Sequence, residues 1–321
     1  MPERVLVLGA GGFIGRRIVA RLARSDWAVA VAAGRRPVRI ADAPAVETTT
    51  LDASDPVALA GALDGIGAVV NCVAAADPAA MAAATRALFE TVATLRAPPR
   101  VVHLSSLAVY GSTPREVDEA APFGADLDPY GAAKVEGEQL ASRYQRAVVL
   151  RPGIVYGPES PLWSDLIARL LVARRLGDLG GAGQGICNLV HVEDVATAVL
   201  ESLRRPVERR VFNLAAPSPS TWNEYFRLYA RALGIDPILR VTRLRLALEL
   251  RLLGPCLKLA GMVLRSEGRV PPAIRPWLLE VCGRRPVMIA RQAGEVLGLD
   301  WMPLRSGLDQ TARWFLGRSA A

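Results

Sequence analysis

The chain has 321 residues, of which 51% are hydrophobic and 22% are charged. This composition is typical of a globular protein with a sizeable core, and it excludes a disordered or collagen-like chain. The net charge is +8, yet only two of the 39 basic residues are Lys, and residues 200–321 alone carry 20 basic and 10 acidic side chains. Because no run of five basic residues and no ladder of aromatic residues accompanies this charge, we expect no nucleic-acid binding.

The four cysteines are widely spaced and the chain has only two histidines. They are Cys72, Cys187, Cys256 and Cys282. Without a C-x-x-C pair or neighbouring His, they predict free thiols and no metal site. The start of the sequence shows no charged segment followed by a long apolar one, so we expect a cytoplasmic protein.

Short apolar runs alternate with Ala-rich segments through the first half of the chain. The predicted strands are Val5–Leu8, Ala28–Ala33, Val46–Leu51, Ala68–Val73, Val101–Leu104 and Ala147–Leu150. The predicted helices are Ile14–Ala23, Pro56–Leu63, Ala80–Leu95 and Tyr130–Arg143. This order predicts an α/β fold, a doubly wound parallel sheet with helices on both faces.

The alternation loosens after about residue 153. Gly-rich and Pro-rich stretches follow, and apolar runs near Leu189–Val192 and Val211–Leu214 suggest that the sheet resumes. We therefore expect a core over 1–152, resumed around 187–215, and a smaller, interleaved C-terminal substrate domain over 153–186 and 216–321.

A glycine-rich turn follows the first predicted strand. It reads Gly9-Ala10-Gly11-Gly12-Phe13-Ile14-Gly15 and opens a predicted helix. Glycine permits the tight turn and the close approach of backbone to a pyrophosphate, and the helix N-terminus offers unpaired N–H groups to it. We expect a Rossmann-like nucleotide site that includes Gly9, Gly12, Phe13, Ile14 and Gly15.

The end of the second strand carries Gly34-Arg35-Arg36 and no acid. A site selective for NAD places Asp or Glu there to bind the ribose hydroxyls, whereas a guanidinium suits a 2′-phosphate. Arg35 and Arg36 therefore favour NADP as the cofactor over NAD, although they also fit an ordinary solvated pair. Asp52 follows the third strand and suits either the adenine end of the cofactor or a turn-capping role.

Tyr130 and Lys134 lie four residues apart on a predicted helix, with Ser105 and Ser106 about 25 residues upstream. This spacing places the phenol and the ammonium group on one helix face. A nearby ammonium group lowers the pKa of a phenol, and a serine hydroxyl can hold a carbonyl oxygen. The pattern predicts proton transfer at a carbonyl or alcohol group.

These residues resemble the extended short-chain dehydrogenases/reductases, the NAD-dependent epimerase/dehydratase family. The resemblance spans nearly the whole chain. It rests on Gly9-x-x-Gly12-x-x-Gly15, Asn71-Cys72-Val73-Ala74, His103 to Gly111, Pro129-Tyr130-x-x-x-Lys134, Leu150 to Pro158, Val190-His191-Val192-x-Asp194, Phe212-Asn213-Leu214 and Leu297 to Trp314.

The resemblance implies roles for individual positions. Ser106, Tyr130 and Lys134 take the catalytic positions, while Val73, Ala74, Pro152 and Val155 adjoin the cofactor together with Tyr130 and Lys134. His191 and Asp194 belong to the scaffold. Members of the family often dimerise, so a homodimer is compatible with the chain.

Three departures separate the chain from family members that act on nucleotide sugars. Cys187 stands where those enzymes carry an Arg that binds the diphosphate, Leu107 and Ala108 replace the acidic pair of the 4,6-dehydratases, and the stretch from Asn71 to Ser105 is short. We therefore expect an oxidoreductase that reduces a ketone or oxidises an alcohol, acting on a rather apolar, non-nucleotide substrate. An epimerase that keeps its cofactor bound is the alternative, and a non-catalytic nucleotide sensor is a third interpretation.

The stretch Leu244–Leu264 is rich in leucine but contains four charged residues and Gly254-Pro255. Charges at a bilayer centre and a proline within the helix argue against a membrane span. We expect two amphipathic helices, and three roles stay open for them: plain packing, a lid over the site, or contact with a membrane surface.

Overall fold

The computed structural model describes residues 2–41, 43–74, 77–113, 115–249, 251 and 274–319. Its main sheet has seven parallel strands in the order β11-β7-β5-β4-β1-β2-β3. They are β1 (Glu3–Leu8), β2 (Ala28–Gly34), β3 (Glu47–Thr50), β4 (Ala68–Asn71), β5 (Arg100–Leu104), β7 (Ala147–Pro152) and β11 (Val211–Leu214). The predicted α/β fold with a doubly wound parallel sheet is confirmed, and all six predicted strands lie in this sheet.

Eleven helices surround or extend this sheet within the described residues. They are α1 (Phe13–Leu22), α2 (Pro56–Ala62), α3 (Pro78–Thr94), α4 (Pro129–Arg143), α5 (Ile167–Val172), α6 (Val192–Arg204), α7 (Trp222–Ala232), α8 (Arg243–Leu248), α10 (Pro276–Gly283), α11 (Arg291–Leu297) and α12 (Leu304–Ser319). A π-helical turn, η2 (Pro161–Leu166), precedes α5. None of these helices has the length and hydropathy required to cross a membrane.

Three helices on one face of the sheet begin with the same Asp-Pro dipeptide. Asp55, Asp77 and Asp128 cap α2, α3 and α4, and each carboxylate accepts hydrogen bonds from backbone N–H groups of the first turn. The proline that follows has no N–H group to leave unpaired and has a backbone angle suited to a helix. This local signal fixes where α4, which carries Tyr130 and Lys134, begins.

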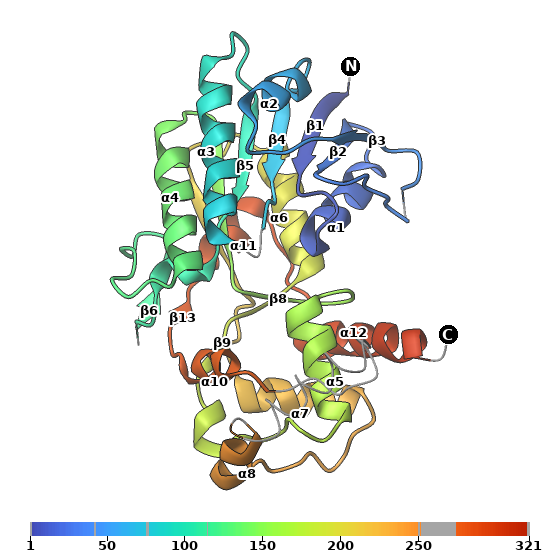
Figure 1. Ribbon diagram of the computed structural model, residues 1–321, viewed down its shortest axis with the longest axis vertical. Helices are drawn as coiled ribbons and strands as arrows, with labels where there is room; N and C mark the ends of the chain where they lie inside the picture. Colours follow the sequence, from blue (N-terminus) through green and yellow to red (C-terminus); the bar gives the residue numbers. More distant parts are fainter. Residues whose placement is uncertain are drawn as a thin grey trace.

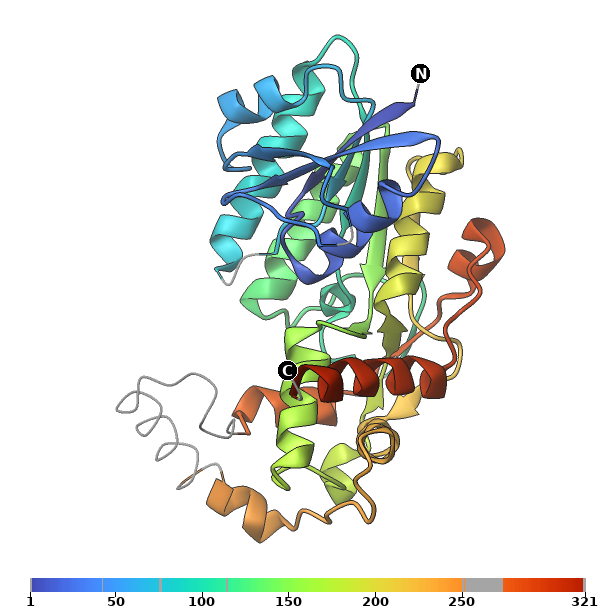
Figure 2. The same cartoon turned by 90° about the vertical axis from the view of Figure 1, so that its right-hand side faces the viewer.

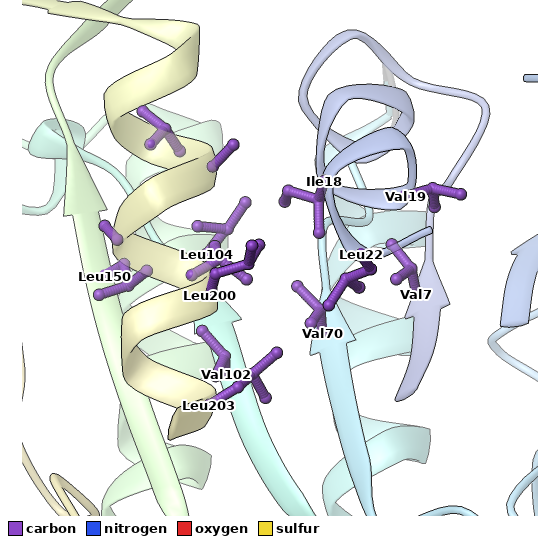
Figure 3. Packing of buried hydrophobic residues seen from close by; sticks show 14 of the residues in the cluster. Val7, Ile18, Val19, Leu22, Val70, Val102, Leu104, Leu150, Leu200 and Leu203 are labelled. Atoms are coloured by element: carbon purple, nitrogen blue, oxygen red, sulfur yellow. The ribbon is translucent and has the colours of Figure 1, made fainter. Parts of the chain in front are cut away.

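The inner strands bury both faces, as expected for a parallel sheet, whereas the edge strand β3 is largely exposed. On β1, Val5 and Val7 pack under α1 and α6, whereas Leu6 and Leu8 pack under α2 and α3. Figure 3 shows the first of these layers, with α1 and α6 side by side over the strands. Because successive side chains of a strand point to opposite faces, a continuous apolar run serves both layers.

A second core lies below the sheet and comes from distant segments. Residues of β8 (Ile154–Tyr156), η2, α5, α7, α10 and α12 form it. Figures 1 and 2 show these helices as a second body beneath the carboxyl ends of the main strands. Short strand pairs connect the bodies: β8 with β10 (Leu189–His191), β9 (Ile186–Cys187) with β12 (Ser220–Thr221), and β6 (Glu116–Val117) with β13 (Val287–Met288).

Two details differ from the sequence prediction. Leu189–His191 does not rejoin the main sheet, because β10 pairs with β8 in a separate two-stranded sheet; β11 alone resumes it next to β7. The residues of α11, expected in the substrate domain, pack on the main core through Ala293 and Leu297 instead. An apolar run shows that a segment is buried but does not show against which neighbour.

The leucine-rich stretch 244–264 lies mostly outside the described residues. Its first part is α8, in which Leu244 is 72% exposed and Leu248 is 45% exposed. Residues 250 and 252–264 are not described, so the lid and membrane-surface interpretations stay predictions.

Candidate active site

One large cavity, of about 2900 Å³, connects the main sheet with the second core. It opens where the strand order reverses, between β1 and β4, which is where doubly wound sheets bind their ligands. Every residue predicted for the site lines it: Gly9, Gly12, Phe13, Ile14, Gly15, Arg35, Arg36, Asp52, Val73, Ala74, Ser106, Tyr130, Lys134, Pro152 and Val155. Residues predicted from separate motifs thus face the same space.

The turn after β1 leaves no room for a side chain at Gly9 or Gly15. Gly9 has a φ of +78°, and a Cβ atom there would lie 2.7 Å from the carbonyl oxygen of Cys72. A Cβ on Gly15 would lie 2.3 Å from the carbonyl oxygen of Gly9. Gly12 caps α1 without a side-chain hydrogen bond, so the first N–H groups of the helix face the cavity rather than a cap. This cradle fits the pyrophosphate of a dinucleotide.

Positive charge gathers at the end of β2. Arg35, Arg36 and Arg39 are exposed and line the cavity. The acid beside them, Asp52, accepts hydrogen bonds from the backbone and the hydroxyl group of Ser54 at 2.9 and 2.7 Å. These bonds, with a smaller contribution from Arg35, lower the pKa of Asp52. Asp52 therefore caps a turn and lines the cavity at once.

Ser106, Tyr130 and Lys134 meet at the centre of the cavity. The hydroxyl group of Ser106 lies near the Tyr130 phenol and acts to lower its pKa. The Lys134 ammonium group donates to the carbonyl oxygen of Leu104 at 2.8 Å and lies 5.7 Å from the centroid of the Tyr130 ring. The helix spacing thus places the phenol and the amine on one face, as predicted.

The protonation of this cluster differs from the expectation. Desolvation by the surrounding protein raises the pKa of Tyr130, and the Ser106 hydroxyl group only partly opposes it. Burial lowers the pKa of Lys134 to about 8, while Cys72 and Glu138 act in the opposite direction. A lowered phenol pKa was expected, but the Lys134 amine is turned toward Leu104 and burial dominates at the phenol.

Ser105, the neighbour of Ser106, has a different role. Its hydroxyl group donates to Glu138 at 2.5 Å. Glu138 forms a two-pronged ion pair with Arg151, whose guanidinium group also donates to the hydroxyl oxygen of Tyr110 at 2.7 Å. This buried network holds the end of β5, so Ser105 has a supporting role. The Ser106 hydroxyl group is the one that can bind a substrate in the cavity.

His191 and Asp194 are parts of the scaffold. The backbone N–H group of Glu193 donates to His191 Nδ1 at 3.4 Å, and that ring lies edge-on to Tyr156. Asp194 accepts from the backbone N–H group of Met302 at 3.1 Å. Neither residue lines the cavity.

Position 187 does not face the cavity either. Cys187 is fully buried in the second core, whereas its neighbours Ile186 and Asn188 line the cavity. The absence of an arginine at this position therefore carries less weight against an anionic substrate than the sequence suggested.

The half of the cavity nearest the second core contains residues that the sequence did not reveal. Three tryptophans line it, Trp163, Trp222 and Trp277, together with Arg169, Arg275 and Arg284. They come from η2, α7, α10 and their flanks, so no spacing within the chain links them.

A doubly wound sheet with a glycine cradle at its switch point, sharing a cavity with a Ser–Tyr–Lys cluster, defines a short-chain dehydrogenase/reductase of the extended type. The family model "NAD dependent epimerase/dehydratase family" matches residues 5–215, and the chain belongs to this family. It is an NAD(P)-dependent oxidoreductase.

Curated relatives and solved structures agree with this assignment. The chain is 31% identical to dTDP-6-deoxy-L-talose 4-dehydrogenase (NAD(P)(+)) of Kitasatospora kifunensis, with 73% of this chain and 80% of the relative covered. It is 28% identical to D-erythronate dehydrogenase of Cupriavidus necator, with 68% and 90% covered. The UDP-glucose 4-epimerase of Thermotoga maritima shares the fold at a TM-score of 0.75 and 18% identity, with 99% and 100% covered.

Proposed function

We propose that the protein is a reductase that prefers NADPH and converts a ketone to an alcohol, or catalyses the reverse reaction. The observation that supports this most directly is the convergence of Ser106, Tyr130 and Lys134 on the cavity that begins at the glycine cradle. A sensor that only bound a nucleotide would need the cradle alone.

The residues divide the chemistry as follows. A bound nicotinamide cofactor supplies a hydride to the carbonyl carbon, or accepts one from the alcohol carbon. Ser106 donates a hydrogen bond to the substrate oxygen, and Tyr130 gives that oxygen its proton or removes it in the reverse direction. Lys134, whose ammonium group lies 5.7 Å from the centroid of the Tyr130 ring, is assigned the role of stabilising the deprotonated phenol during turnover, which requires the amine to turn from the carbonyl oxygen of Leu104 toward the phenol.

The preference for NADPH rests on the end of β2. Arg35, Arg36 and Arg39 offer three guanidinium groups there, and the residues of β2 (Ala28–Gly34) include no acid. A charge-assisted, forked hydrogen bond suits a phosphate better than a hydroxyl group. The relative from Kitasatospora carries both cofactors in its name, so the proposed preference depends on the residues of this chain.

The substrate is proposed to be small, rather apolar and free of a nucleotide. Relatives include dTDP-sugar dehydrogenases and reductases but also D-erythronate dehydrogenase, whose named substrate carries no nucleotide. The wall of the cavity near the second core is rich in indole and aliphatic side chains, which favours an apolar ligand.

Substitution of Tyr130 tests the proposed chemistry. Tyr130→Phe removes the proton donor but little binding surface, so turnover should fall by about 10²–10⁴-fold. NADPH affinity, measured by fluorescence titration, should stay within about twofold of the wild type. Near-normal turnover of a ketone by this variant would contradict the catalytic assignment.

The cofactor bound to the purified protein distinguishes the reductase from the epimerase alternative. An exchangeable cofactor that is consumed as substrate is reduced supports the reductase. NAD that stays bound through gel filtration, together with inversion of a substrate centre and no net consumption of cofactor, would contradict the reductase and support the epimerase.

A further inference from the structure

Three indole rings gather on the cavity wall that faces the second core. Trp163 lies in η2, Trp222 begins α7 and Trp277 lies in α10. The ring centroids of Trp163 and Trp222 are 5.4 Å apart, and those of Trp163 and Trp277 are 5.6 Å apart at an interplanar angle of 86°. Segments distant in sequence thus converge on one aromatic surface within the cavity.

This surface is not a closed piece of core. Trp163 and Trp277 are only partly buried, while Trp222 is fully buried. The Nε1–H group of Trp222 has no hydrogen-bond partner in the described part of the chain. Buried indole N–H groups normally find an acceptor, so the residues that the structure describes leave this wall incomplete.

The side chains around the indoles are aliphatic. They are Leu162, Leu166, Ile186, Ile274 and Val281, and all of them line the same cavity. Such a wall offers a flat ligand dispersion contacts and removes its apolar surface from water.

Within the described part of the chain, one guanidinium group on this wall has no ion-pair or hydrogen-bond partner. Arg169 lies 3.9 Å from Asp165, and Arg284 forms an ion pair of 3.1 Å with Glu280. By contrast, the guanidinium group of Arg275, two residues before Trp277, has no ion pair or hydrogen bond to any residue that the structure describes. It is exposed and lines the cavity. A free guanidinium group beside an aromatic surface attracts a carboxylate.

We propose that the tryptophan wall (Trp163, Trp222 and Trp277) binds a flat, unsaturated ring of the substrate and that Arg275 binds a carboxylate group attached to it. The substrate class is thus an aromatic or polycyclic keto or hydroxy acid. This inference rests on the proposed reductase function, because the wall shares its cavity with Ser106 and Tyr130.

Calorimetric titration with four probes tests the wall without any turnover. The probes are 2-naphthoate, 2-naphthalenemethanol, cyclohexanecarboxylate and UDP-glucose. We expect 2-naphthoate to bind at least tenfold more tightly than 2-naphthalenemethanol, which lacks the charge, and than cyclohexanecarboxylate, which lacks the aromatic ring. Tighter binding of UDP-glucose than of 2-naphthoate would overturn the proposal.

Variants assign the binding to residues. Trp163→Leu and Trp277→Leu should each weaken 2-naphthoate at least tenfold, and Arg275→Gln should remove its advantage over 2-naphthalenemethanol. Trp301→Leu and Arg291→Gln, at positions outside the cavity, are matched controls. NADPH affinity within twofold of the wild type shows that each variant is folded. Unchanged naphthoate binding in both cavity tryptophan variants would overturn the proposal.

The two proposals fail in different ways. If 2-naphthoate binding depends on Trp163 and Arg275 but no ketone reduction depends on Tyr130, the proposed role of the tryptophan wall is supported and the proposed reductase function is contradicted. If ketone reduction depends on Tyr130 but 2-naphthoate does not bind, the proposed reductase function is supported and the proposed role of the tryptophan wall is contradicted.

Discussion

Five of the glycines that line the cavity lie after β1 or at the end of β2, whereas three tryptophans and three arginines line the half of the cavity next to the second core. At these glycines, backbone atoms come within reach of a ligand because side chains are absent. The other half depends on large side chains that four separate elements bring together. We therefore propose that the half lined by glycines (the cofactor half) holds the cofactor and that the half lined by large side chains holds the substrate.

The buried ion pair between Glu138 and Arg151 supports the ends of β5 and β7, close to the Ser–Tyr–Lys cluster. Glu138→Gln would leave the Arg151 charge buried without its partner, which should destabilise the fold by about 3–5 kcal/mol. Urea denaturation measures this loss. Glu136→Gln, on the exposed side of the same helix, breaks only a surface pair with Arg86 and should cost less than about 1 kcal/mol. Equal losses in the two variants would contradict a stabilising role of the buried ion pair.

Gly15→Ala should affect the cofactor half alone. Its Cβ would clash with the carbonyl oxygen of Gly9 and with the Cα atom of Ala10, at 2.3 and 2.9 Å. Since overpacking typically costs about 1–3 kcal/mol, we expect NADPH affinity to fall by roughly 10- to 100-fold. Gly61→Ala, in α2 with open space around it, is the control and should stabilise the protein by about 0.5–1 kcal/mol. Normal NADPH binding by Gly15→Ala would contradict the cradle.

The double substitution Arg35→Ala and Arg36→Ala should affect the two cofactors differently. The loss of charge-assisted bonds to a 2′-phosphate should weaken NADPH by about 1.5–3 kcal/mol and leave NADH nearly unchanged. Titrations of both cofactors measure the difference, with Arg291→Ala as a surface control. Equal losses of affinity for NADPH and NADH would contradict the proposed preference for NADP.

Asp194 joins the two bodies, because it lies on α6 and binds the backbone of Met302 just before α12. Burial raises its pKa from 3.8 to about 6. The carboxyl group therefore adds stability below pH 3.8, and this contribution is lost as the pH rises through about 6. Relative to Asp194→Asn, the wild type should lose about 1–2 kcal/mol of unfolding free energy between pH 4 and pH 7. Chemical denaturation at both pH values measures this, and a difference independent of pH would contradict it.

Local signals predicted most of the fold. Apolar runs marked all six predicted strands of the sheet, and the Asp-Pro starts of α2, α3 and α4 agree with the predicted helices to within two residues. The pairing of β10 and the packing of α11 escaped prediction, because burial leaves a similar apolar run whichever element covers it.

The candidate site was likewise predicted from the sequence only in part. The sequence by itself determined the glycine cradle, the arginines after β2 and the Tyr130–Lys134 spacing, since each depends on the geometry of a single turn or helix. Only the tertiary structure decided that Ser105 binds Glu138 while Ser106 meets Tyr130, and that Cys187 faces the second core. It alone brought Trp163, Trp222 and Trp277 together, because contacts between distant segments depend on how packed elements lie in space and leave no periodic trace in the chain.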